Sequence, residues 1–109
     1  MANRSAMLEL LQEIETEMRG LSLWETVAPP ADAFDSQLPF CFDTMRFSQW
    51  LQWVFVARFR AIIAGGHRLP ESCGVANMAE EALRELDVQT DALVVLLKAF
   101  DAQFPSAGQ

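Results

Sequence analysis

Three residues near the middle of the chain have the types needed for nucleophilic catalysis: Cys41, Asp43 and His67. A thiol, a base and an orienting acid work together only when they meet within hydrogen-bond reach. The residues between Asp43 and His67 have the pattern of one long helix. A helix rises 1.5 Å per residue, so the two side chains would lie roughly 30 Å apart at its two ends. We therefore expect these residues to form no catalytic site.

The sequence gives no sign of a metal or cofactor site. His67 is the only histidine, and Cys41 and Cys73 lie far apart without a second pair of cysteines. This spacing fits neither a zinc site nor a disulfide framework, and it favours two reduced, buried or half-buried thiols. The acidic residues of the N-terminal segment have no histidine at metal-binding spacing, and we interpret them as a solvated face: Glu9, Glu13, Glu15 and Glu17.

Composition bounds the class of protein. The chain has 109 residues, of which 51% are hydrophobic, enough for one domain over 1–109 with an ordered core from about 4 to 104. Its formal charge of −7 disfavours direct binding to nucleic acid or to anionic membrane. The longest apolar run, 53–57, is far shorter than the roughly 20 residues of a membrane span, and no signal peptide is visible. We expect a soluble cytoplasmic protein.

The segment 39–66 predicts the central element of the fold. Asp43 or Thr44 can cap a helix by accepting a hydrogen bond from a first-turn amide. Gly65 and Gly66 can end it, because glycine enters the left-handed conformation without steric cost. The helix between them is apolar on nearly every side, which indicates burial at the centre of a domain.

One charge lies within the apolar arc of this helix. A narrow polar stripe holds Ser48, Gln49, Gln52 and Arg60, with Val56 among them. Arg58 instead points to the middle of the apolar arc, and a buried guanidinium needs a partner because it cannot lose its proton. We predict a buried or half-buried ion pair from Arg58 to Glu15, with Asp101 as second choice. The alternative is that Arg58 lines a pocket for an anionic ligand.

Three further helices are predicted from apolar residues at helical spacing, over 3–19, from 77 or 78 to 86, and over 88–104. We expect Gly20 to mark the exit of the first and Asp87 to cap the last. Glu80 should face solvent and pair with Arg84. The inward faces are Met7, Leu10, Leu11, Ile14 and Met18, then Met78, Ala82, Leu83 and Leu86, then Leu93, Leu96, Leu97, Phe100 and Phe104.

A long connection separates the first two predicted helices. Residues 25–38 contain prolines, aspartates and a serine, which are typical of irregular structure. We expect Trp24, Phe34 and Phe40 to hold this loop against the helices. The predicted fold is therefore all-α, a four-helix bundle-like single domain with the second helix central and a long loop strapped across it.

A spaced set of aromatic, proline and polar residues runs through the chain: Trp24, Pro29, Phe34, Ser36, Pro39, Phe40, Asp43, Thr44, Met45, Trp50, Leu51, Gln52, Trp53, Val54 and Arg58, followed more weakly by Leu69, Pro70, Val75, Ala76, Ala82 and Leu83. In this set the chain resembles the YqcC-like family of small, uncharacterised bacterial proteins, and the resemblance covers nearly all of it. Some members carry tyrosines at Met78 and Ala79 and an acid at Gln49, so roles of those groups do not transfer to this chain.

The resemblance implies a helical bundle without an assigned activity. It also implies a link to RNA modification, because family members are often encoded beside a tRNA pseudouridine synthase. This chain is too short to be that enzyme, and it offers no basic surface for RNA.

Two classes of function follow. The first is a non-enzymatic protein-interaction module that binds an unknown protein partner, as a monomer or weak homodimer. The second is an accessory factor for a tRNA-modifying enzyme, and an independent enzyme ranks third. The candidate binding surface is Asp43, Gln49, Trp50, Trp53 and Arg58, although two tryptophans on a central helix also fit ordinary packing.

Overall fold

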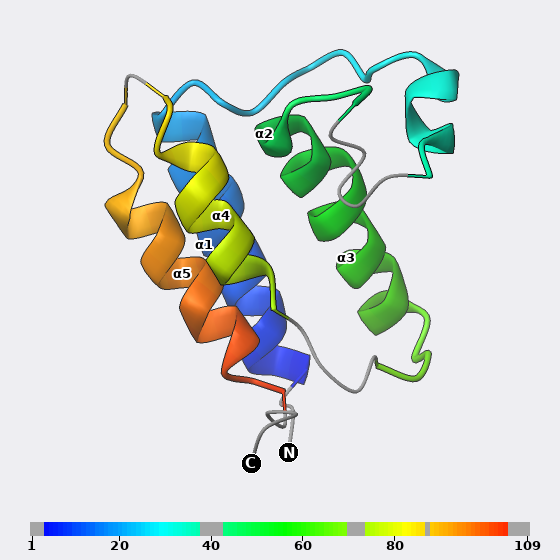
Figure 1. Cartoon of the computed structure of the whole chain (residues 1–109). Helices are drawn as coiled ribbons and strands as arrows, with labels where there is room; N and C mark the ends of the chain where they lie inside the picture. Colours follow the sequence, from blue (N-terminus) through cyan, green and yellow to red (C-terminus); the bar gives the residue numbers. More distant parts are fainter. Residues whose placement is uncertain (1–3, 38–42, 70–73, 87, 105–109) are drawn as a thin grey trace.

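A computed structural model describes residues 4–37, 43–69, 74–86 and 88–104. Within these ranges the chain is helical and contains no strand (Figure 1). The elements are α1 (Arg4–Gly20), a short 3₁₀ helix η1 (Ala31–Asp35), α2 (Phe47–Trp50), a π-helical segment η3 (Leu51–Val56), α3 (Ala57–Ala64), α4 (Val75–Leu83) and α5 (Asp91–Asp101). Because α2, η3 and α3 form one continuous rod, the prediction of an all-α fold with four helices is confirmed. Phe40, Cys41, Cys73 and Asp87 lie outside the described residues.

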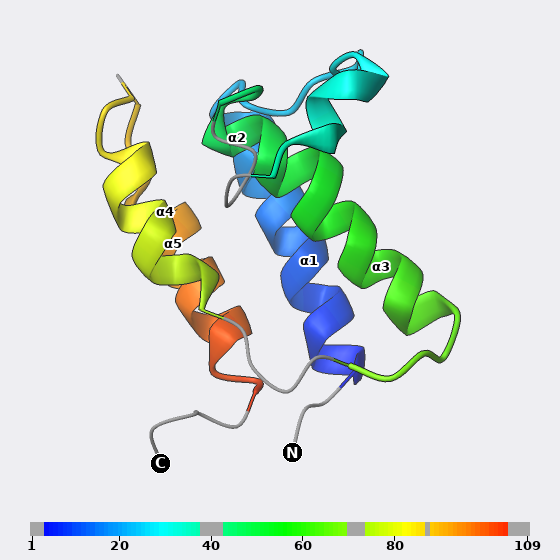
Figure 2. The same cartoon turned by 45° about the vertical axis from the view of Figure 1, so that its right-hand side comes forward.

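The helices pack around a shared centre. α5 packs against α1 and α4, and α1 also contacts α3. Figure 2 shows α1 between α3 and the pair formed by α4 and α5. In this view the second rod borders α1 on one side, and its first segment, α2, also contacts α4.

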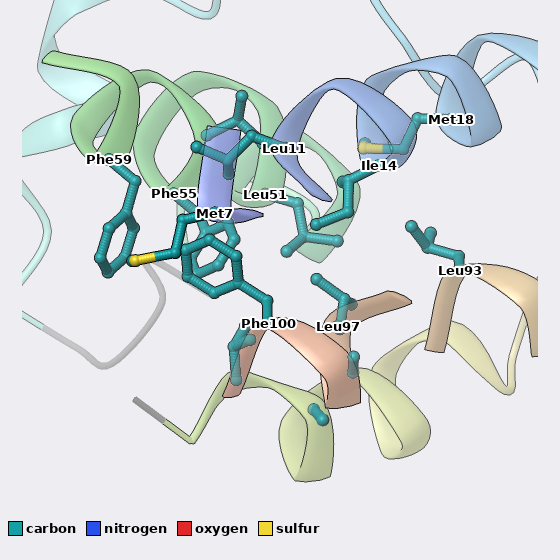
Figure 3. Close-up of a cluster of buried hydrophobic side chains, with 14 of the residues drawn as sticks. Met7, Leu11, Ile14, Met18, Leu51, Phe55, Phe59, Leu93, Leu97 and Phe100 are labelled. Atoms are coloured by element: carbon teal, nitrogen blue, oxygen red, sulfur yellow. The ribbon is translucent and has the colours of Figure 1, made fainter. Parts of the chain in front are cut away.

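One apolar core joins these elements (Figure 3). The inward side of α1 repeats at helical spacing, and its four core residues are fully buried, as their pattern predicts. Phe59 of α3 and Phe100 of α5 meet edge to face with ring centroids 4.9 Å apart, an orientation that aromatic rings favour. The principal core side chains are Met7, Leu11, Ile14, Met18, Leu51, Phe55, Phe59, Leu93, Leu97 and Phe100.

Two helices end with a left-handed residue. α1 ends at Gly20, the predicted exit, and the left-handed residue after it is Ser22, with φ of 62°. The amide of Leu23 donates to the carbonyl of Met18 at 2.8 Å, which satisfies an acceptor that the helix leaves open. After α3 the left-handed residue is Gly66, with φ of 66°, as predicted.

The second rod begins at Phe47, and Arg46 occupies the N-cap position. The side-chain oxygen of Gln49 accepts a hydrogen bond from the backbone amide of Arg46 at 2.7 Å. This is one half of a capping box, in which a residue of the first turn reaches back to the cap. The prediction of a cap at Asp43 or Thr44 is wrong, because both residues precede the first helical turn.

Part of the polar stripe of the rod lies in the interior of the bundle. Ser48, Gln52 and Val56 are buried, with Gln52 only 4% exposed. The outward side includes exposed Ala57 and Ala61, so the rod is not buried on nearly every side. A π-helix contains more residues per turn than an α-helix, and η3 therefore rotates the residues that follow it relative to a regular helix.

This orientation contradicts the predicted ion pair of Arg58. Arg58 is exposed, whereas Glu15 lies within 2.7 Å of Arg60 and 2.8 Å of Arg19. Arg60 belongs to the polar stripe and not to the apolar arc that contains Arg58. Glu15 thus links α1 to α3 through Arg60.

The second predicted partner, Asp101, has a different role. Its carboxylate accepts hydrogen bonds from the backbone amides of Ala76 at 2.9 Å and Val75 at 3.3 Å. It therefore caps the N-terminus of α4 from α5, and α4 starts two or three residues before its predicted position. Met78, predicted to point inward, is exposed, and Ala79 is buried.

The connection between α1 and α2 is held differently from the expectation. Trp24 is half-buried against the core, and the guanidinium of Arg19 lies 5.3 Å from the centre of its ring. Phe34 is exposed, so the expected aromatic contact from this residue is wrong. Hydrogen bonds fix the connection instead, as described for the site below.

The Glu15 carboxylate is largely buried, with 14% of its side chain exposed. Burial alone raises its pKa, but the hydrogen bonds and charges of Arg19 and Arg60 lower it, and the resulting pKa lies below the ordinary value of a glutamate.

We predict that Arg60→Met lowers the free energy of unfolding by about 1–2 kcal/mol, the usual size for a hydrogen bond to a partly buried charge. The matched control, Arg58→Met, removes an exposed arginine from the same helix and should change stability by less than about 0.5 kcal/mol. Urea denaturation measures both. A larger loss of stability for Arg58→Met than for Arg60→Met would instead support the ion pair first predicted between Arg58 and Glu15.

We also predict that the contribution of Glu15 depends on pH. Because its pKa is lowered on folding, the carboxylate stabilises the protein above the ordinary glutamate pKa of about 4.3, and this stabilisation disappears as the pH falls through the lowered value. The stability difference between wild type and Glu15→Gln should be present at about pH 7 and small at about pH 3. Glu13→Gln, on the exposed face, is the control. An equal Glu15→Gln difference at both pH values would contradict the prediction.

Candidate functional site

A polar cluster surrounds Glu25, the residue that follows Trp24 at the start of the long connection. Its carboxylate accepts hydrogen bonds from Arg46 at 2.9 Å, from the indole of Trp53 at 3.3 Å and from the amide of Gln49 at 3.3 Å. The three donors come from the beginning of the second rod, and they bring together segments that lie more than 20 residues apart in the sequence. The cluster therefore fastens the connection to the rod.

The main chain of Glu25 is held by a second set of bonds. Its backbone amide donates to the side-chain oxygen of Gln52 at 2.7 Å, and its carbonyl accepts from the Gln52 amide nitrogen at 2.7 Å. A primary amide can satisfy one backbone donor and one acceptor at once, as a neighbouring strand would. These bonds explain how a glutamine is buried within a largely apolar helix.

The chemistry of the cluster is that of a structural joint. The Glu25 side chain is 28% exposed, and its carboxylate lies 2.9 Å from the guanidinium of Arg46. Gln49 uses both ends of its amide, because its oxygen caps the rod and its nitrogen binds Glu25. The described cluster contains no thiol, hydroxyl or imidazole that this carboxylate could activate.

The structure brings together two of the five predicted surface residues, Gln49 and Trp53, at Glu25. Trp50 is half-buried and stacks on Phe47 with ring centroids 5.7 Å apart, which matches ordinary packing. Asp43 and Arg58 are exposed and take no part in the bonds of this cluster. The five residues therefore have three different surroundings.

Sequence reasoning missed the residue at the centre of the cluster. Glu25 carries no local signal, because it is a single acid before a proline-rich loop. Gln52 was assigned only to the polar stripe of the rod, and its bonds to a backbone segment were not predicted. A polar residue in a largely apolar helix is a signal for such a bond, because buried polar groups need hydrogen-bond partners.

A second surface feature is a groove of about 330 Å³ between α4 and α5. Glu80 lies 2.6 Å from Lys98 across it, and this lysine holds the pKa of Glu80 below its ordinary value. The predicted partner, Arg84, lies instead 3.7 Å from Glu81. Val95 on the wall of the groove is 63% exposed.

The residues considered for catalysis do not converge in the described parts of the chain. Asp43 precedes the second rod and His67 follows it, so the whole rod separates them. No group of three His, Cys, Asp or Glu side chains that could hold a metal ion occurs among the described residues. None of the described helices combines the length and the apolar character needed to cross a membrane.

Comparisons with known proteins agree with the fold. The DUF446 family model, described as tRNA pseudouridine synthase C, matches residues 6–103. An uncharacterised protein of Haemophilus influenzae is 38% identical over 80% of this chain and 82% of its own length. Uncharacterised protein YqcC of Escherichia coli is 33% identical over 86% of each chain. The solution NMR structure of that YqcC superposes with a TM-score of 0.81, at 30% identity, over 95% of this chain and 89% of the other.

One relative is much longer than this chain. The tRNA pseudouridine synthase C of Pectobacterium carotovorum is 38% identical over 72 residues. These residues are 66% of this chain and 19% of the synthase. The chain thus spans about a fifth of that protein.

We predict that Gln52→Leu lowers the free energy of unfolding by about 1–3 kcal/mol, because the main chain of Glu25 loses both partners while the packing volume is retained. Gln12→Leu, on the exposed face of α1, is the control and should stay within about 0.5 kcal/mol of wild type. Chemical denaturation gives both values, and amide hydrogen exchange at residue 25 should become faster only in the Gln52 variant. Unchanged exchange would show that the joint has another support.

Proposed function

The chain belongs to the DUF446 family and is related to E. coli YqcC, as its residue pattern predicts. On this premise we propose that the protein works by binding a protein partner and performs no chemistry of its own. The observation that supports the proposal is the use of the polar side chains. Arg46, Gln49, Gln52 and Trp53 all bind Glu25 and thereby hold the fold together.

The charge supports a protein partner over a nucleic acid. A net charge of −7 repels phosphate, and RNA-binding surfaces depend on clustered lysine and arginine. All eight arginines and lysines of the chain are described, and five of them lie within 4 Å of an acidic side chain: Arg19, Arg46, Arg60, Arg84 and Lys98. We place the protein in the bacterial cytoplasm.

A second candidate is narrower: this chain assists a tRNA pseudouridine synthase by binding the enzyme. The specific support is the synthase of Pectobacterium carotovorum, in which a segment similar to this chain makes up 19% of a longer protein. Two segments joined in one chain are held close together, at a high effective concentration. Two separate chains need a binding surface to achieve the same proximity. Under this proposal the present chain and the enzyme associate in trans.

Affinity capture with the tagged chain tests the proposal. We expect a protein partner to be recovered with and without nuclease treatment, since no RNA bridge is required. Recovery of a pseudouridine synthase would favour the second candidate, and direct binding of the purified pair would establish it. The control bait is Gln52→Leu, in which the connection to the second rod is loosened.

Two results would contradict the main proposal. The first is recovery that nuclease abolishes, which would mean that RNA carries the interaction. The second is formation of pseudouridine in tRNA by the purified chain alone.

A further inference from the structure

The connection between α1 and the second rod forms a surface that the packing of the fold does not use. We define the strap as the described residues 25–37 and 43–45 of this connection. Gln52 fixes its start by bonding the main chain of Glu25. Near its end, the hydroxyl of Thr44 donates to the carbonyl of Ala33 in its middle at 2.6 Å. The hydroxyl of Ser36 also donates to Asp43. These bonds give the described strap a defined shape.

The strap exposes apolar side chains despite this order. Val27 is 77% exposed and Phe34 is 38% exposed, whereas Ala33 between them in the sequence is buried. Figures 1 and 2 show η1, which carries Phe34, at a corner of the molecule beyond the second rod and away from α4 and α5. An exposed aromatic ring on an ordered element is the kind of residue that anchors protein interfaces, because little conformational entropy is lost when it is buried.

The charges of the strap have one sign. Between Trp24 and Arg46 the sequence contains Glu25, Asp32, Asp35 and Asp43 and no lysine or arginine. The three aspartates are exposed, and Asp32 and Asp35 flank Phe34 on η1. An aromatic side chain between two solvated carboxylates complements a surface with an apolar depression bordered by basic side chains.

We propose that the strap binds a basic surface of a partner protein, with Phe34 as the apolar anchor and Asp32 and Asp35 paired with lysine or arginine of the partner. This inference rests on the proposed protein-binding function and specifies its surface and the chemistry of the partner.

Other occupants fit the strap less well. RNA would bring phosphates against the three exposed aspartates, which is repulsive. A second copy related by two-fold symmetry would place the same acidic surface against itself, which is also unfavourable. The groove between α4 and α5 is a weaker docking surface because Glu80 and Lys98 already neutralise each other across it.

Site-specific photo-crosslinking in cells tests the strap with the full-length chain. Phe34 is replaced by p-benzoylphenylalanine, and the control position is Val95, which is more exposed and lies in the α4–α5 groove. We expect position 34 to crosslink a protein through a peptide that borders lysine or arginine residues, and position 95 to give no such product.

The charge dependence is tested in the same experiment. D32N/D35N should lower the crosslink yield at position 34 about fivefold, as expected for the loss of two exposed ion pairs. E9Q/E13Q, which removes the same charge from the exposed face of α1, should leave the yield unchanged. Thermal melts of the purified variants establish that both fold. When the crosslinking is repeated in cell lysate, increasing the salt from about 0.05 to 0.5 M should reduce the wild-type crosslink in parallel.

Several outcomes overturn the inference. These are no crosslink at position 34, a crosslink there to RNA or to a second copy, or a yield that neither D32N/D35N nor salt reduces. Nuclease-resistant capture by the wild-type chain then separates the two proposals. If a partner is captured but position 34 gives no crosslink, the strap is not the binding surface and the proposed protein-binding function stands. If nothing is captured and position 34 is silent, both fail.

Discussion

The arrangement of this protein depends on the hydrogen bonds between Gln52 and the main chain of Glu25. Both bonds are 2.7 Å long, and they place a polar side chain in a largely apolar helix at a point where backbone groups of another segment need partners. An unpaired backbone group in a partly buried position costs about 1–3 kcal/mol, so the two segments are strongly favoured in this relative position. The joint fixes the start of the strap against the second rod.

Polar contacts between segments recur at other critical positions. Asp101 of α5 caps α4, and Glu15 of α1 binds Arg60 of α3. Each contact lies beside the apolar core and fixes how two helices are placed relative to each other. Apolar packing alone tolerates several such arrangements, whereas a directional bond to a particular backbone amide or guanidinium favours one of them. The small bundle thus combines a general hydrophobic driving force with a few specific polar contacts.

These contacts also shape the functional interpretation. The polar groups of the second rod that could have formed a site are occupied in holding the strap, and the strap presents its aspartates and Phe34 outward. The surface of the strap is therefore acidic and carries exposed apolar residues. Such a surface is suited to a protein with a basic face.

The sequence by itself determined the helices and most of the core, because the apolar spacing in α1 and α5 and the glycine pair after α3 are local signals. The buried or left-handed residues that the pattern predicts are Leu11, Ile14, Leu93, Leu97 and Gly66. Of the candidate site it identified Gln49 and Trp53 but not Glu25. The partners of Glu15, Asp101 and Gln52 required the tertiary structure, since each bond joins residues more than 20 positions apart. Helical periodicity measures angles around one axis and contains no information on which side meets a neighbouring segment. The π-helical segment η3 alters those angles as well, so only the packed structure decided that Arg58 faces solvent and Gln52 the interior.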